Sequence, residues 1–277
     1  MATSTISYLL VPASRPDRFE KALGSPADAV IIDLEDAVAQ EDKDSALQHL
    51  KDALQAGLPR AAHVRINAAD SEWFERDIEA LAVLSEKARD FLAGVFIPKA
   101  EKAATVARVV SALDAAGDSE VVALIESAFG VAHAREIAVV DGLSRFAVGT
   151  ADLSFDLDVE TVSSTVDWVY AQLVIESRLA GLAGPIASPP FEIKDLETVE
   201  REAVRLRGLG ATAQLCIHPA QVGSIHAGFL PSDERVEWAS RVVAATAETD
   251  GASQVDGQMV DRPVWERAKR ILTQVDR

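Results

Sequence analysis

The sequence has a single cysteine, so no disulfide can form within the chain. That residue, Cys216, lies in the apolar segment 213–217, which favours a buried structural thiol over a nucleophile. No segment reaches the ~18 uninterrupted apolar residues of a membrane span. The first residues lack the basic start and apolar stretch of a signal peptide, so we expect a cytoplasmic protein.

Positive charge is also scarce. The chain has 27 lysines and arginines against 44 aspartates and glutamates, which gives a net charge of −17 and an isoelectric point of about 4.7. Such a field disfavours nucleic acid and anionic membranes as partners. An anionic small substrate is still compatible with it, because local basic residues or a metal ion can outweigh the global charge.

Short apolar runs alternate with segments of helical period along the chain. The 277 residues, 48% of them hydrophobic, are enough for one large barrel or for two domains. The predicted strands cover residues 8–12, 29–33, 62–67, 94–99, 120–127, 145–149, 184–187 and 213–218. The predicted helices between them include residues 16–23, 42–56, 103–116, 162–180 and 196–209.

Eight such units without a hairpin signal predict an α/β protein with a TIM (β/α)₈ barrel. The alternative is a doubly wound open sheet, but no GxGxxG motif follows the first strand. We expect a barrel over residues 1–230 and a C-terminal helical extension over residues 231–277. Within the extension the sequence predicts a helix at 232–249, a flexible joint at 251–254, a turn at 255–261 and a last helix from Pro263.

Two predicted strands end close to a carboxylate. Glu126 follows the fifth strand, and Asp152 follows the sixth, about one βα unit further on. On neighbouring parallel strands both carboxylates would emerge at the rim where barrels place their chemistry, and hard oxygen ligands there suit Mg²⁺. The alternative is that the two residues cap the helices that follow.

Other charged residues fall at the same predicted rim. Arg65 lies inside Val64-Arg65-Ile66, where a buried guanidinium needs an anion, so it is a candidate clamp for a substrate carboxylate. Asp33 or Glu35 would hold Arg65 or a metal-bound water. Several further residues at this rim have both a functional and a structural interpretation. Asp36 caps the next segment or acts in the site, Lys99 pairs with Glu126 or an anion, and His218 is a base or a structural histidine.

Two basic residues are candidates for the phosphates of a larger ligand. Arg15 follows the first strand, and Lys43 starts a predicted helix, although a solvated lysine explains Lys43 as well. We expect the segment 188–191 to form a rigid loop over the rim, because it contains Pro189 and Pro190.

Taken together, the strand ends resemble the citrate lyase beta-subunit-like proteins of the HpcH/HpaI aldolase superfamily over residues 6–273. The segments that carry the resemblance are LVPASRP at 10–16, DLEDAV at 33–38, VRIN at 64–67, PK at 98–99, LIES at 124–127, GTADL at 149–153, CIHPAQ at 216–221 and DGQMVDRP at 256–263. Seven of these motifs in order, with a matching tail, are specific for the family and less so for the substrate.

The resemblance implies a Mg²⁺-dependent carbon–carbon lyase, usually a homotrimer, acting on CoA or acyl-carrier thioesters of 3-hydroxy acids and releasing a 2-oxoacid. It places the metal ligands on Glu126 and Asp152 and the substrate arginine on Arg65. The acidic pair falls on Asp33 and Glu35. Substrate contacts are expected from Gly149, Thr150 and Ala151. An aspartate from a neighbouring subunit's tail acts at the thioester end in such lyases, and Asp261 is the candidate here.

The sequence departs from the family pattern at three positions. Ala151 replaces an acidic residue, Ala13 replaces the glycine that many members have after Pro12, and the segment 187–189 stands where many members have an aspartate. These departures leave the metal ligands in place. They leave open which acyl group and which carrier the protein recognises. Two rival functions are therefore a thioesterase or synthase for malyl-type thioesters and a non-catalytic barrel that binds acyl-CoA or a 2-oxoacid.

Overall fold

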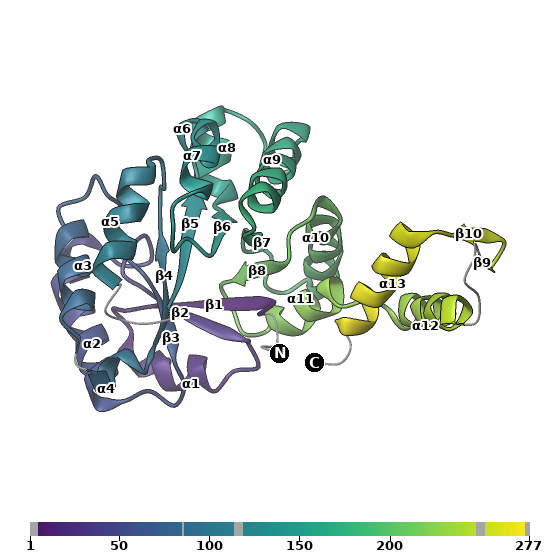
Figure 1. The fold of residues 1–277 in the computed structure, drawn as a ribbon. Helices are drawn as coiled ribbons and strands as arrows, with labels where there is room; N and C mark the ends of the chain where they lie inside the picture. Colours follow the sequence, from purple (N-terminus) through teal and green to yellow (C-terminus); the bar gives the residue numbers. More distant parts are fainter. Residues whose placement is uncertain (1–4, 85, 114–118, 248–252, 275–277) are drawn as a thin grey trace.

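A closed barrel of eight parallel strands forms the body of the protein (Figure 1). The computed structural model describes residues 5–84, 86–113, 119–247 and 253–274. Each strand pairs with the next, and β8 returns to β1, so the TIM-barrel prediction is confirmed and the open-sheet alternative is wrong. The strands are β1 (Ser7–Pro12), β2 (Ala29–Asp33), β3 (Ala62–Arg65), β4 (Leu92–Ile97), β5 (Glu120–Ile125), β6 (Arg145–Val148), β7 (Ala183–Ala187) and β8 (Ala213–Cys216).

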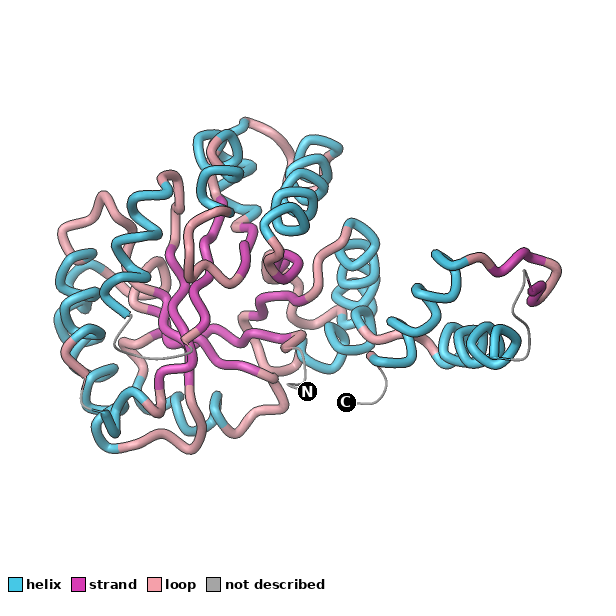
Figure 2. Tube along the Cα trace, viewed as in Figure 1, coloured by secondary structure: helices cyan, strands magenta, loops and turns pink. Residues whose placement is uncertain are grey.

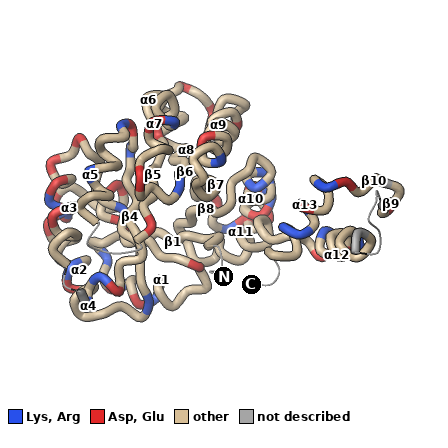
Figure 3. Tube along the Cα trace, in the orientation of Figure 1, with Lys and Arg blue, Asp and Glu red and all other residues tan. Residues whose placement is uncertain are grey.

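Helices surround the barrel and cover its outer wall (Figure 2). They are η1 (Pro16–Arg18), α1 (Phe19–Leu23), η2 (Gln40–Asp42), α2 (Lys43–Ala56), α3 (Phe74–Ala82), α4 (Glu86–Arg89), α5 (Ala103–Leu113), α6 (Ala128–Ala132), α7 (Ala134–Ala138), α8 (Thr150–Leu157), α9 (Ser164–Ala180), α10 (Leu196–Leu209) and α11 (Gln221–Phe229). Acidic and basic residues are interspersed along the helices (Figure 3).

The strands are apolar on both faces because both faces are buried. Ile31, Phe96 and Leu124 belong to a cluster that fills the barrel. The alternate residues, such as Val30 and Ile32, belong to the larger cluster between the barrel wall and the helices. Side chains therefore alternate between the inside and the outside of the barrel along each strand.

A buried polar layer closes the N-terminal end of the barrel interior. Tyr8 Oη donates to Glu120 Oε2 at 3.0 Å, and His63 Nε2 lies 2.9 Å from the same oxygen. Arg145 Nη1 lies 3.8 Å from Glu120 Oε1. The apolar layer above these groups separates them from the C-terminal rim, so the barrel has one polar cluster at each end.

Two elements of the body differ from the prediction. Residues 150–157 form α8, a helix that starts directly after β6, where the sequence pattern indicated a strand end and loop. Residues 86–89 form the short helix α4, which no pattern predicted. Because α8 starts at Thr150, Asp152 lies in the first turn of a helix rather than at a strand end.

The C-terminal segment projects from the barrel (Figure 1). It contains α12 (Asp233–Ala247), the hairpin β9 (Ser253–Val255) and β10 (Gln258–Val260), and α13 (Arg262–Thr273), which pack around their own apolar cluster. Residues 253–254 of the predicted flexible joint are thus strand, and residues 251–252 lie outside the described residues. None of the described helices is long and apolar enough to cross a membrane.

Candidate active site

Asp33 and Arg65 form a buried ion pair at the C-terminal ends of β2 and β3. The parallel register of β2 and β3 sets the two residues side by side. Asp33 accepts two hydrogen bonds from the guanidinium, from Nε at 2.6 Å and from Nη2 at 2.7 Å. Burial opposes the charge on Arg65, but the contact with Asp33 outweighs burial and raises the pKa of Arg65. The guanidinium therefore stays charged and fixed in one orientation.

Glu35 lies next to this pair and is itself buried. Its carboxylate is 3.1 Å from Arg65 Nη1 and 3.3 Å from Lys99 Nζ. Both Glu35 oxygens are buried, and each is paired with one of these two cations. Burial raises the pKa of Glu35 to about 7, against the opposing effect of Arg65. A carboxyl group in this state is suited to accept or release a proton at neutral pH.

Glu126 follows β5 and is only 5% exposed. Its Oε2 accepts a hydrogen bond from the backbone N–H of Lys99 at 3.0 Å. Lys99 has a φ of 46°, a rare conformation for a residue other than glycine. Burial raises the pKa of Glu126 to about 7, while nearby Arg65 acts in the opposite direction.

Asp152 faces the same hollow as Glu126. The hollow has a volume of about 690 Å³, and Lys99, Lys102 and Phe155 also line it. The negative charge of Asp152 contributes to the raised pKa of Glu126, which places the two carboxylates within electrostatic range. The helix-cap alternative is wrong for both residues, because α6 is capped by Ser127 and α8 starts from Gly149.

The donor set of this hollow fits a hard divalent cation. Among the described residues, no group of three His, Cys, Asp or Glu side chains is placed to hold a metal ion. Mg²⁺ usually takes only one or two carboxylates and completes its octahedron with water and substrate oxygens, so Glu126 and Asp152 would suffice. A bound cation would also favour the ionised form of Glu126, which burial now disfavours.

Lys43 has a structural role that the sequence did not reveal. It is only 8% exposed, and its Nζ donates to the carbonyls of Leu34 and Glu35 and to Asn67 Oδ1. Both interpretations of Lys43, as a solvated residue and as a phosphate contact, are therefore wrong. The ammonium group instead holds the loop that carries Glu35, and Asn67 is fixed in turn by Asp77.

The remaining predicted residues fall in different environments. Arg15 is exposed and paired with Asp17, and His218 is exposed with Nδ1 accepting from the N–H of Ala220. Thr150 does not line the hollow: its Oγ1 lies 3.4 Å from Tyr170 Oη, and its backbone N–H donates to Ser188 Oγ at 2.6 Å. Asp261 caps α13 by accepting from Val264 N–H, in the projecting segment.

Asp36 and Lys99 also depart from the expectations. Asp36 does not cap the next segment, because the N-cap positions of η2 and α2 are Ala39 and Asp42, and neither helix has a side-chain cap. The Lys99 ammonium pairs with Glu35 and lies 3.9 Å from Asp36, while only its backbone contacts Glu126. The backbone role of Lys99 carried no sequence signal, because the Pro98-Lys99 pair does not encode a positive φ.

Comparison with known proteins identifies the family. The sequence model of the HpcH/HpaI aldolase/citrate lyase family matches residues 7–219. The chain belongs to this family. It is 35% identical to a citrate lyase subunit beta-like protein of Mycobacterium tuberculosis, over 96% of this chain and 93% of the relative.

Two relatives from Cereibacter sphaeroides differ in the reaction they are named for. A (3S)-malyl-CoA thioesterase is 33% identical, over 98% of this chain and 94% of the relative. An L-malyl-CoA/beta-methylmalyl-CoA lyase is 32% identical, over 97% and 93%. The family therefore includes lyases as well as thioesterases.

A solved structure of the Mycobacterium tuberculosis protein CitE supports the same assignment. It was determined in complex with magnesium, acetoacetate and coenzyme A. It matches this chain with a TM-score of 0.84 and 32% identity, over 100% of this chain and 99% of that one. The likeness thus extends over the projecting C-terminal segment as well as the barrel.

Proposed function

We propose that this protein is a Mg²⁺-dependent carbon–carbon lyase that cleaves a 3-hydroxyacyl thioester, of the citryl-, citramalyl- or malyl-CoA type, into a 2-oxoacid and an acyl thioester. The observation that carries the proposal is that Glu126 and Asp152 line one hollow, with the Arg65–Asp33 pair close by. The magnesium-bound CitE structure and the malyl-CoA lyase relative support it.

In the proposed reaction the bond between C2 and C3 of the thioester breaks. The C3 hydroxyl loses its proton and becomes the carbonyl of the 2-oxoacid, and the electron pair of the broken bond passes to C2 as an enolate, which then takes up a proton. Mg²⁺ on Glu126 and Asp152 would lower the pKa of the hydroxyl and stabilise the negative charge.

Three residues of the chain are assigned the remaining functions, which are binding of the carboxylate, proton transfer and contact with the phosphates of CoA. Arg65 has five N–H donors, of which Asp33 occupies two, so donors remain for the carboxylate of the 2-oxoacid. Glu35 is the group to which we assign proton transfer, because its carboxyl lies beside Arg65 and Lys99 and its pKa is about 7. Arg15, which is exposed after β1, is the proposed contact for the phosphates of CoA.

The experiment incubates purified protein and Mg²⁺ with a panel of 3-hydroxyacyl-CoAs and separates the products by chromatography. The lyase proposal expects a 2-oxoacid and an acyl-CoA in equal amounts. Free CoA with the intact hydroxy acid would instead establish the second candidate, a thioesterase, which the 33% identical malyl-CoA thioesterase favours. Tight binding of the panel without turnover would refute both activities and leave a binding protein.

The metal assignment has its own test. Calorimetry should show that Glu126→Gln loses Mg²⁺ binding at least tenfold relative to wild type. Glu197→Gln is the matched control, because Glu197 is a solvent-exposed carboxylate of α10. Unchanged Mg²⁺ affinity in Glu126→Gln would contradict the assignment, whatever the activity.

We also propose that the segment 231–277 packs on a neighbouring subunit of a homotrimer and brings Asp261 to that subunit's site. Its projection from the barrel favours this arrangement (Figure 1). Glu126→Gln and Asp261→Asn should each be inactive alone. Because a mixed trimer would contain some sites with both residues intact, mixing the two variants should restore part of the activity. No recovery in demonstrably mixed oligomers would contradict a shared site.

A further inference from the structure

The helix that carries Asp152 begins without a side-chain cap of its own. Asp152 lies in the first turn of α8, which follows β6 directly and has Gly149 as its N-cap residue. Gly149 has no side chain to offer, and a Cβ at this position would collide with the carboxylate of Glu126. The first N–H groups of a helix have no partner within the helix. The start of α8 therefore depends on a hydrogen bond from another element.

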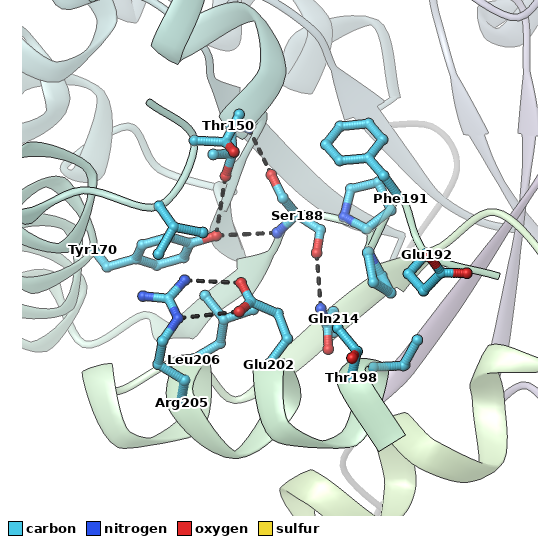
Figure 4. A pocket seen from close by; sticks show the side chains of 15 residues that line it. Thr150, Tyr170, Ser188, Phe191, Glu192, Thr198, Glu202, Arg205, Leu206 and Gln214 are labelled. Atoms are coloured by element: carbon cyan, nitrogen blue, oxygen red, sulfur yellow. Dashed lines mark hydrogen bonds and ion pairs between the residues drawn. The ribbon is translucent and has the colours of Figure 1, made fainter. Parts of the chain in front are cut away.

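Ser188, the residue after β7, makes this hydrogen bond (Figure 4). Its Oγ accepts from the N–H of Thr150 at 2.6 Å and donates to the carbonyl of Val148 at 2.6 Å. The hydroxyl thus uses its one donor and one of its acceptor positions on the two residues that flank Gly149. A single side chain thereby joins the end of β6 to the first residue of α8.

Ser188 is in turn held by two fully buried residues. Its N–H donates to Tyr170 Oη at 3.1 Å, and its carbonyl accepts from Gln214 Nε2 at 3.0 Å. Tyr170 belongs to α9 and Gln214 to β8. Figure 4 shows Ser188 between Thr150, Tyr170 and Gln214. Because the backbone of Ser188 is anchored on two other elements, its hydroxyl is a fixed point for the start of α8.

The placement of this helix start bears directly on the two carboxylates of the hollow. Asp152 is the third residue of α8, so its carboxylate moves with the first turn. On the other side of the junction, Gly149 N–H donates to the carbonyl of Ile125, the residue before Glu126, at 3.1 Å. The junction of β6 and α8 is thus held by β5 on one side and by Ser188 on the other.

We propose that Ser188 is a positioning residue, which fixes the first turn of α8 and so sets where Asp152 lies relative to Glu126. Because these two carboxylates are the proposed Mg²⁺ ligands, this role of Ser188 rests on the proposed function. Ligands that are already ordered lose less freedom when they bind. Without the hydroxyl, the first turn of α8 would have an unpaired amide, and Asp152 would have to be ordered during Mg²⁺ binding.

Ser188→Ala tests the proposal with two measurements. In the metal-free protein, hydrogen exchange of the Thr150 amide, followed by NMR, should be about tenfold faster, because an amide that loses its partner opens more readily. Calorimetry should show an Mg²⁺ affinity about fivefold below that of wild type, which is the effect of about one net hydrogen bond. Ser188→Thr retains the hydroxyl and should behave as wild type in both measurements.

Ser177→Ala is the matched control. Ser177 is a buried serine of α9, and its Oγ has no hydrogen-bond partner among the residues that the structure describes. The control removes the same atom from a similarly buried position, so Thr150 exchange and Mg²⁺ affinity should stay as in wild type. If Ser188 had only a packing role, Ser188→Ala and Ser177→Ala would give the same result in both measurements.

Wild-type exchange of the Thr150 amide in Ser188→Ala, or an Mg²⁺ affinity equal to that of Ser177→Ala, would refute the proposal. If Ser188→Ala does not fold, Tyr170→Phe decides, because it frees the N–H of Ser188 and keeps the buried ring. It should change both quantities in the same direction by a smaller factor, and no change would refute the proposal. If wild type binds no Mg²⁺, the metal assignment fails, while Thr150 exchange still decides whether Ser188 holds the helix start.

Discussion

The absence of a side chain at Gly149 makes room for the carboxylate of Glu126. A Cβ placed on Gly149 would meet Oε1, Cγ and Cδ of Glu126, with Cδ only 2.6 Å away. The two residues follow neighbouring strands, and Gly149 N–H donates to the carbonyl of Ile125 at 3.1 Å. The backbone of β6 thus fixes how closely the buried carboxylate can approach the start of α8.

Gly149→Ala should therefore displace the Glu126 carboxylate rather than the backbone, because a side chain yields more easily than a strand. We expect the Mg²⁺ affinity to fall at least tenfold in calorimetry while the protein stays folded. Gly208→Ala is the matched control, because nothing lies within 4 Å of a Cβ at that position. Equal Mg²⁺ affinity in the two variants would contradict the steric role of Gly149.

Arg65 should contribute strongly to stability as well as to activity. Arg65→Met removes the partner of two buried carboxylates, Asp33 and Glu35. Breaking one side of a buried ion pair typically costs about 3–5 kcal/mol, so the free energy of unfolding in urea should fall by about that amount. A loss similar to that of Arg76→Met, which breaks an exposed pair with Asp44, would show that the buried pair is not important for the fold.

Asp28 joins the start of β1 to α11 at the N-terminal end of the barrel. Its Oδ2 accepts from the N–H groups of Ile6 and Ser7 and from His226 Nε2 at 3.1 Å. Half-burial alone would raise the pKa of Asp28, but these hydrogen bonds outweigh it and lower the pKa to about 2. Because the folded-state pKa is below the unfolded-state value, the stabilisation is complete above about pH 4 and is lost as the pH falls toward 2.

Asp28→Asn should remove this pH-dependent contribution. Between pH 4 and pH 2 the free energy of unfolding of wild type should fall by about 1 kcal/mol more than that of the variant, after allowance for solvent screening. Chemical denaturation at several pH values measures the difference. Asp44→Asn, at an exposed position, should follow wild type, and an identical acid slope in Asp28→Asn would refute the linkage.

Cys216 should be chemically inert in the folded protein. The residue is fully buried, and burial raises the pKa of its thiol to about 12. Since the thiolate is the reactive form, iodoacetamide at pH 8 should leave native Cys216 unmodified and alkylate it in urea. Mass spectrometry measures the fraction modified, and equally fast alkylation in both states would show that the thiol is accessible. The prediction of a buried structural thiol is confirmed by its position in β8.

Strong hydrophobic periodicity explains why the barrel was predictable. The apolar run that ends in Asp33 predicts a strand at residues 29–33. The structure has β2 at the same residues, and all five are buried. The apolar period also predicts a helix at residues 162–180, and α9 begins at Ser164, after a Ser163 cap. Helix α8 was not predicted, because it follows β6 without a loop and its eight residues have no strong apolar period.

The candidate site was only partly predictable for a related reason. The sequence placed Glu126 and Arg65 at strand ends, but it did not show that Lys43 would turn inward to bind the carbonyls of Leu34 and Glu35. Nor did it show the positive φ of Lys99. Both depend on loops whose conformation is set by contacts with other strands.

The sequence by itself determined the alternation of strands and helices and the order of charged residues at strand ends. The reason is that burial of one face or of both faces gives each element a characteristic spacing of apolar residues, which can be read along the chain. Tertiary structure alone decided which of those charges meet. Parallel register set Asp33 beside Arg65, and the closed barrel brought Glu126 and Asp152 to one hollow. Those pairings join residues far apart in the chain, so only the packing of the whole barrel fixes them.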